Sequence, residues 1–234
     1  MPDGFHVATR QTNLPTRYKG IVSIVEMGTN IGATANTYPY FMHCFTEGGA
    51  IDSGILYKNK QWLLYAFGTI AEPDQWKQKV CSGFKAGDTV QITSRVAASG
   101  NTFTVEAKKV GSSVNNVLNV NLSANRASSL RTSGSIVARE MNLASHLSNL
   151  NGEDAFFSWS KFKESTVTNV ANVSSKMTST NSWLVTPHYD SPSVNHDWVG
   201  YSVNTPTTVN GYVVDRAWGR CNQNKPPGKG GGWQ

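Results

Sequence analysis

Residues 88–110 read DTVQITSRVAASGNTFTVEAKKV, and this stretch decides the fold class. Apolar side chains alternate with polar ones on both sides of residues 99–101, so that Val90 and Ile92 share one face of the first half, and Phe103 and Val105 share one face of the second. Alternation with period two is typical of a strand with one buried face. A Ser-Gly-Asn turn between two such strands predicts a β-hairpin.

Similar segments recur along the whole chain. Further strands are predicted at residues 4–10, 20–27, 39–45, 61–67, 116–122, 134–141, 155–162, 166–173, 183–187, 198–203 and 208–214, and short helices at residues 72–80 and 143–150. Many short strands at this spacing predict an all-β fold, a two-sheet antiparallel β-sandwich of the concanavalin A-like or jelly-roll type. We expect one domain over residues 1–221 and a flexible tail over residues 222–234, which are rich in Gly, Pro and Lys.

Composition narrows the classes of function. Only 15% of the residues are charged, and the 21 basic residues behind the net charge of +6 are scattered rather than clustered in a stripe. A nucleic-acid partner is therefore not expected. No apolar run is long enough to span a bilayer, and residues 1–20 lack the features of a signal peptide.

The cysteine count is odd. A Cys44–Cys81 disulfide with Cys221 free and three separate thiols are both compatible with the sequence. The spacing of the three cysteines matches no zinc site, and we expect no cofactor.

Several segments follow one another in a recognisable order. Asp52-Ser53-Gly54 precedes an aromatic-rich strand at residues 61–67, and Gly87-Asp88 precedes the hairpin; a Ser-rich stretch at residues 123–133, the sequence GSIVARE at residues 134–140 and an aromatic segment at residues 156–169 follow. Over about residues 38–170 this order resembles the glutamic peptidases, or eqolisins, a secreted family of acid-active endopeptidases on a β-sandwich. The resemblance implies an extracellular or cell-surface location.

The resemblance does not extend to the catalytic pair of that family, which consists of a Gln and a Glu. In the alignment Asp52 stands at the position of the Gln and Ser135 at that of the Glu, so the dyad is not retained. Glu140 falls one position past the second, non-catalytic Glu of the family, and alternation puts it on the opposite face from Ser135.

Two other segments contain residue types found in an aspartic peptidase and in a metal site. Asp52-Ser53-Gly54 also looks like the tripeptide of aspartic peptidases, but one copy would require a homodimer, and a plain turn is the alternative. His188, Asp190 and His196 are ligand types for a divalent metal, but their spacing matches no established site and a polar loop is the favoured interpretation.

Two hypotheses about function follow. The first is a non-catalytic binding or interaction protein that holds a glycan, peptide or protein partner on a concave sheet lined by Trp62, Tyr65 and Trp159, with Ser135 as a polar contact. The second is a divergent acid-active hydrolase of peptidase type, with Asp52 as general base and Glu140 or Asp190 as its partner. The sequence leaves the oligomeric state open.

Overall fold

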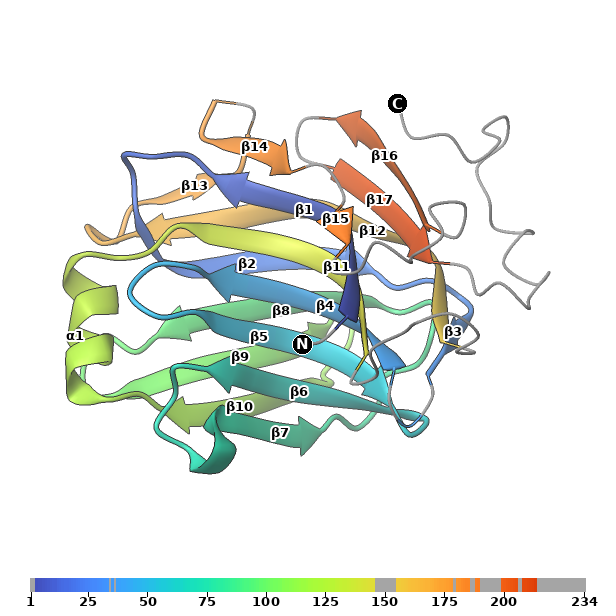
Figure 1. Cartoon of the computed structure of the whole chain (residues 1–234), viewed down its shortest axis with the longest axis horizontal. Coiled ribbons are helices and arrows are strands. Elements are labelled where there is room, and N and C mark those ends of the chain that lie inside the picture. The colour runs from blue at the N-terminus through green and yellow to red at the C-terminus, as the bar shows by residue number, and fades with distance from the viewer. Residues whose placement is uncertain are drawn as a thin grey trace.

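The strands form two antiparallel sheets that pack face to face (Figure 1). The computed structural model describes residues 3–33, 35, 37–145, 155–178, 180–185, 188–189, 199–205 and 208–213. The two-sheet β-sandwich predicted from the alternating pattern is thereby confirmed. We call the two layers sheet A and sheet B.

Each sheet joins strands from distant parts of the chain. Sheet A has the order β14 (Ser182–Val185), β1 (Asp3–Thr12), β11 (Val137–Ser145), β4 (Thr37–Phe45), β5 (Ile51–Lys58), β6 (Gln61–Gly68) and β7 (Trp76–Val80), and β15 (His188–Tyr189) also pairs with β1. Sheet B has the order β10 (Asn115–Asn121), β9 (Thr102–Lys109), β8 (Thr89–Val96), β2 (Tyr18–Glu26), β12 (Phe156–Asn169), β17 (Thr208–Val213) and β16 (Val199–Thr205), and β13 (Ser174–Lys176) and β3 (Ile31–Gly32) also pair with β12.

Most predicted strands are present, but several elements differ from expectation. Residues 155–173 contain one long strand, β12, instead of two, with a register shift between Phe162 and Glu164. Asp52-Ser53-Gly54 lies inside strand β5 rather than in a turn. The helix predicted at residues 72–80 is wrong, because a short 3-10 turn, η1 (Pro73–Gln75), leads directly into edge strand β7.

The helix that forms is α1 (Ala124–Thr132), in the Ser-rich stretch. The side chain of Ser123 caps it by accepting a hydrogen bond from the backbone N–H of Arg126 at 3.2 Å. Ala127 and Leu130 are fully buried and fix the helix against one end of the sandwich (Figure 1). Of the second predicted helix, Leu143–Ser145 end strand β11, and residues 146–150 lie outside the described residues.

The main core fills the space between the sheets. Phe41 and Phe45 of sheet A pack with Val25, Ile92 and Phe103 of sheet B, and all five are fully buried. The rings of Phe45 and Phe103 meet edge to face with centroids 5.3 Å apart. Burial of each such side chain contributes about 2–3 kcal/mol, so this layer holds the sheets together.

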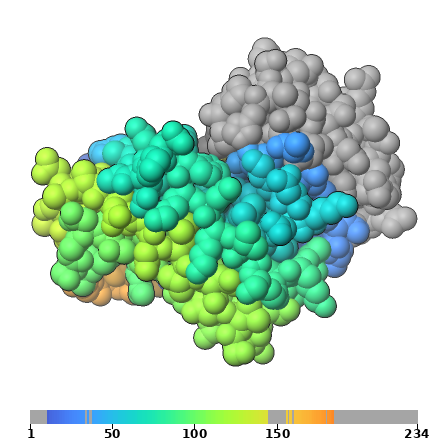
Figure 2. Space-filling view, turned by 90° about the horizontal axis from the view of Figure 1, so that it is seen from below, coloured from blue at the N-terminus to red at the C-terminus, as the bar shows by residue number. Residues whose placement is uncertain are grey.

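Strands β7 and β10 lie side by side at one edge of the sandwich, where the two sheets meet. The Nζ atom of Lys79 on β7 donates to the carbonyl oxygen of Val117 on β10 at 2.9 Å. Figure 2 views the molecule from this edge. Among the described residues, no helix is long and apolar enough to cross a membrane.

Candidate functional site

The face of sheet A that points away from sheet B carries Asp52. Its row runs across β11, β4, β5 and β6, where Ala138, Cys44, Asp52 and Phe67 stand directly opposite one another. Side chains in such a row point to the same side of the sheet. We call this surface the outer face of sheet A.

The next row on the same face carries Glu140. Here Glu140, Met42, Gly54 and Tyr65 stand opposite one another across the same four strands. Asp52 and Glu140 therefore lie one row apart on strands separated by β4, about 10 Å across the strands. Met42 and Cys44 of β4 stand between the two carboxyl-bearing residues on this face.

Gly54 is required by the close approach of β4 to β5. A Cβ atom at this position would lie 2.2 Å from the backbone oxygen of Phe41, closer than any real contact. Gly54 is itself buried between Met42 and Tyr65 in this row. The glycine of the Asp-Ser-Gly tripeptide thus shapes the surface beside Asp52.

Both carboxylates act electrostatically on the same two neighbours. Burial raises the pKa of the Cys44 thiol well above its ordinary value, and the charges of Asp52 and Glu140 and a hydrogen bond to Asp52 raise it further. Burial likewise raises the pKa of Tyr65, and Asp52 and Glu140 again contribute. The thiol and the phenol thus stay protonated and can donate hydrogen bonds.

Glu140 has a hydrogen-bond partner in the site, whereas the Tyr65 hydroxyl has none among the described residues. The Nδ2 atom of Asn142 donates to Oε1 of Glu140 at 3.0 Å, and Glu140 is only 5% exposed. The hydroxyl oxygen of Tyr65 is buried and has no hydrogen-bond partner among the described residues. An unpaired buried hydroxyl costs free energy and often marks a functional position.

Aromatic rings lie on the same face of sheet A as the carboxylates. Tyr65 stacks on Trp76 with centroids 5.5 Å apart and meets Tyr40 edge to face at 5.1 Å. Tyr40 also contacts Tyr38, whose ring lies under the ammonium of Lys58, 4.6 Å from the ring centroid. With Met42, Leu56 and Leu63 these rings form a second apolar cluster, separate from the main core.

The inner face of the same strands holds a buried polar network centred on His43. Nδ1 of His43 lies 3.0 Å from Oγ of Ser94, and Nε2 lies 2.9 Å from Oγ of Ser23. Ser53 donates to Ser94 at 2.8 Å. Burial and the positive charge of Arg139 lower the pKa of His43 to about 3, so the imidazole is neutral.

Arg139 extends this network to β12. Its guanidinium donates to Oγ of Ser165 at 2.8 Å and lies 5.1 Å from the centroid of the Phe162 ring. The network residues Ser53, His43 and Arg139 each follow or precede one residue of the site, namely Asp52, Cys44 and Glu140. The network therefore fixes the inner face of the three strands that carry the site on their outer face. Sequence analysis did not identify it, although alternation in residues 38–45 places His43 between Phe41 and Phe45 on the inner face.

The structure brings together some of the predicted site residues and separates others. Trp62 lies in the main core, 4% exposed, on the opposite face of β6 from Tyr65, so the two cannot form one stacking surface. Ser135 does not face Asp52: it is fully buried in a bridge to Tyr18, and its Oγ accepts from the N–H of Glu47 at 3.0 Å. Glu140 occupies the face on which the alignment put Ser135.

The remaining candidates are described only in part. Trp159 belongs to β12 in sheet B, and its side chain lies outside the described part. The backbone of His188 pairs with His6, while Asp190 and His196 lie outside the described residues. Where side chains are described, no three or more His, Cys, Asp and Glu residues are arranged to hold a metal ion.

Cys44 and Cys81 are free thiols, so the disulfide between them that the sequence allowed does not form. Cys44 belongs to the outer face of sheet A, whereas Cys81 is part of the main core. The two residues therefore lie on opposite faces of the sheet.

Comparison with known proteins identifies the fold. No protein-family model matches the chain, and no curated protein matches it. A solved structure of Scytalido-glutamic peptidase with a peptide-based transition state analog matches with a TM-score of 0.59 and 13% identity, covering 91% of this chain and 98% of that chain. SCP-B, a member of the eqolisin family in complex with the tripeptide Ala-Ile-His, matches with a TM-score of 0.57, 13% identity and the same coverage.

The similarity extends beyond residues 38–170, for which the sequence indicated it, to nearly the whole chain. At this level of identity the match concerns the backbone architecture. The chain has the fold of the glutamic peptidases, a two-sheet antiparallel β-sandwich.

Proposed function

We propose that this chain is a hydrolase of peptide bonds that uses Asp52 and Glu140 as a pair of carboxyl groups. The observation that carries the proposal is their common position on the outer face of sheet A, where both act on Cys44 and Tyr65. The similar folds of a glutamic peptidase with a bound transition state analog and of an eqolisin with a bound tripeptide support a peptide substrate.

The chemistry needs one carboxyl group in each protonation state. The ionised member takes a proton from a water molecule as its oxygen attacks the substrate carbonyl, and the protonated member gives its proton to the departing amine. The Tyr65 hydroxyl, buried without a partner among the described residues, is available to donate to the developing oxyanion. Because one carboxyl group must be protonated, activity is expected at acid pH.

The composition of the pair differs from the Gln and Glu of the glutamic peptidases. Asp52 replaces the Gln whose amide donates to the oxyanion, and a carboxylate cannot donate. This difference favours a second candidate function, a site on the outer face of sheet A that binds an extended peptide beside the stacked Tyr65 and Trp76 without cleaving it. An extracellular or cell-surface location belongs to both proposals.

A digestion assay at acid pH tests the proposal. Wild type, Asp52→Asn and Glu140→Gln are incubated with an unfolded protein substrate, and new amino termini are counted. Each substitution is expected to lower the rate by about 10²–10⁴-fold, the usual contribution of a general acid or base. Glu106→Gln, on the outer face of sheet B, is the matched control and should cleave as wild type does.

The outcomes separate the two candidates. Cleavage that is lost in both variants and kept in the control supports the hydrolase. Wild type that binds a peptide without cleaving it supports the binding site. Cleavage that survives both substitutions would remove Asp52 and Glu140 from the mechanism.

A further inference from the structure

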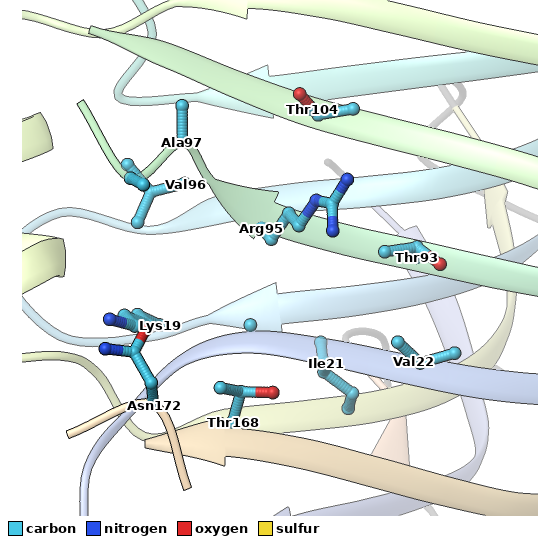
Figure 3. A pocket seen from close by; sticks show the side chains of 12 residues that line it. Lys19, Ile21, Val22, Thr93, Arg95, Val96, Ala97, Thr104, Thr168 and Asn172 are labelled. Carbon is cyan, nitrogen blue, oxygen red and sulfur yellow. The ribbon is translucent and has the colours of Figure 1, made fainter. Parts of the chain in front are cut away.

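A hollow lies on the outer face of sheet B, the side of the molecule opposite Asp52 and Glu140. Its volume is about 490 Å³, within the range of sites for small ligands. Figure 3 shows Arg95 and Thr104 over β8 and β9, Thr168 on the opposite side, and Lys19 and Asn172 together at one end.

Gly20 is the structural cause of the hollow. Across β12, β2, β8 and β9, the residues Thr168, Gly20, Arg95 and Thr104 stand in one row. A Cβ atom at Gly20 would lie 3.3 Å from Cβ of Arg95 and 3.9 Å from Cβ of Thr168, so even a methyl group would fill the floor. Because Gly20 has no side chain, the row is open beside the guanidinium.

The hollow is positively charged. Arg95 is exposed and makes no hydrogen bond or ion pair with any described residue, and Lys19 donates from Nζ to the carbonyl oxygen of Val170 at 3.1 Å. None of the described residues that line the hollow carries a carboxylate. Glu106 lies opposite Thr93 in the adjacent row, but its Oε1 already accepts from Asn115 at 2.8 Å. An anionic group therefore has an unoccupied guanidinium to bind.

Hydroxyl and amide groups supply the other polar contacts. Thr93, Thr104, Thr168 and Asn172 line the hollow, and in the part of the chain that is described no aromatic ring does. Thr104 donates to Asn119 at 2.9 Å, which leaves its oxygen able to accept. Neutral sugars and single-stranded nucleic acids are bound largely by stacking on aromatic rings, for which this hollow offers no surface.

A peptide cannot bind at the floor of this hollow by pairing with a strand edge. Strands β2, β8 and β9 have a hydrogen-bonded neighbour on both sides, so no strand edge is free there. Recognition must come from side chains alone. A guanidinium with several hydroxyl groups suits a ligand that combines a carboxylate with many hydroxyls.

We propose that this hollow binds an acidic oligosaccharide, with Arg95 pairing with a uronate carboxylate and the threonines and Asn172 contacting sugar hydroxyls. The proposal is independent of hydrolysis on the outer face of sheet A. Gly20 provides the space and Arg95 the charge.

Binding of trigalacturonate, measured by titration calorimetry, tests the proposal. Arg95→Ala should weaken binding by roughly tenfold or more, the worth of a hydrogen-bonded charge. Gly20→Ala should weaken it as well, although it changes no charge. Lys108→Ala removes one positive charge from the same face outside the hollow and should bind as wild type does.

Each outcome of these titrations either supports the proposal or overturns it. Selective loss in Arg95→Ala and Gly20→Ala supports the proposal. Equal weakening by Lys108→Ala would show general charge attraction and overturn it, as would equal affinity for the neutral trisaccharide maltotriose. Equal affinity for a short polyglutamate peptide would show that the site binds carboxylates without recognising sugars, which would overturn the proposal. The proposal would also be overturned if folded wild type did not bind trigalacturonate.

Discussion

Tyr65 on β6 and Glu140 on β11 stand in one cross-strand row of sheet A, with Met42 and Gly54 between them. The hydroxyl of Tyr65 is buried without a partner among the described residues, and its pKa is raised by burial and by the nearby carboxylates. This arrangement destabilises the free protein and is suited to a substrate oxygen that needs a donor.

Tyr65→Phe separates these two roles of the hydroxyl. Because it removes an unsatisfied polar atom and keeps the ring on Trp76, the free energy of unfolding should stay equal or rise. The rate of peptide hydrolysis should fall by about 10–10³-fold if the hydroxyl binds the oxyanion. Denaturant unfolding and kcat measure the two effects; a loss of stability with unchanged kcat would contradict this role.

His43 should make the protein sensitive to acid. Its pKa is about 3 in the folded state, against an ordinary value of 6.5, so between these values the unfolded chain binds one more proton than the folded chain. Stability therefore falls as pH decreases through this window, with a contribution of up to about 1.4 kcal/mol per pH unit.

The control for this prediction is His43→Gln, which cannot titrate. The variant should be less stable at neutral pH, because it disturbs the contacts with Ser23 and Ser94, and its stability should fall less steeply between pH 6.5 and 4. Urea unfolding at several pH values measures both slopes. Equal slopes would contradict a neutral His43 in the folded state.

Gly54 and Gly20 should differ in their tolerance of alanine. At Gly54 the new methyl group would collide with the backbone of Phe41 at 2.2 Å, whereas at Gly20 it would meet a side-chain atom of Arg95 at 3.3 Å. We expect Gly54→Ala to lower the free energy of unfolding by at least about 3 kcal/mol and Gly20→Ala by less than about 1 kcal/mol. Similar values in denaturant unfolding would contradict the close approach of β4 to β5.

The architecture could be predicted from the sequence because alternation with period two is a local signal. Residues 89–96 and 102–109 form strands as that pattern indicates. Residues 76–80 carry no clear alternation because they form an edge strand with little burial, and the pairing with β6 makes them a strand rather than the predicted helix. Ser123 is the N-cap residue of α1, a signal that was present but outweighed by the surrounding serines.

The candidate site could be predicted only in part. The sequence indicates Asp52 and Glu140 as candidate carboxyl groups. Whether they share a face of the sheet depends on the register of β5 and β11 against β4, and no local pattern contains that register. The choice of Ser135 failed because that residue precedes β11, whose first residue is Val137. Period two should have separated Trp62 from Tyr65, since an odd spacing places them on opposite faces of a strand.

The two described thiols should react slowly in the folded protein. Burial raises the pKa of Cys81 to about 12 from 9.0, and burial and two carboxylates raise that of Cys44 well above its ordinary value. At neutral pH the thiolate fraction of Cys81 is then about a thousandfold lower than in the unfolded chain. Cys221→Ser isolates the two thiols, and fast modification by a disulfide reagent without denaturant would contradict their raised pKa values.

The most direct test of the central claim is a crystal structure at acid pH with a peptide-based transition state analogue. We predict that the tetrahedral hydroxyl of the analogue lies within hydrogen-bond distance of both Asp52 and Glu140, with the Tyr65 hydroxyl on its oxygen. An analogue that blocks cleavage while bound away from the outer face of sheet A would contradict the account.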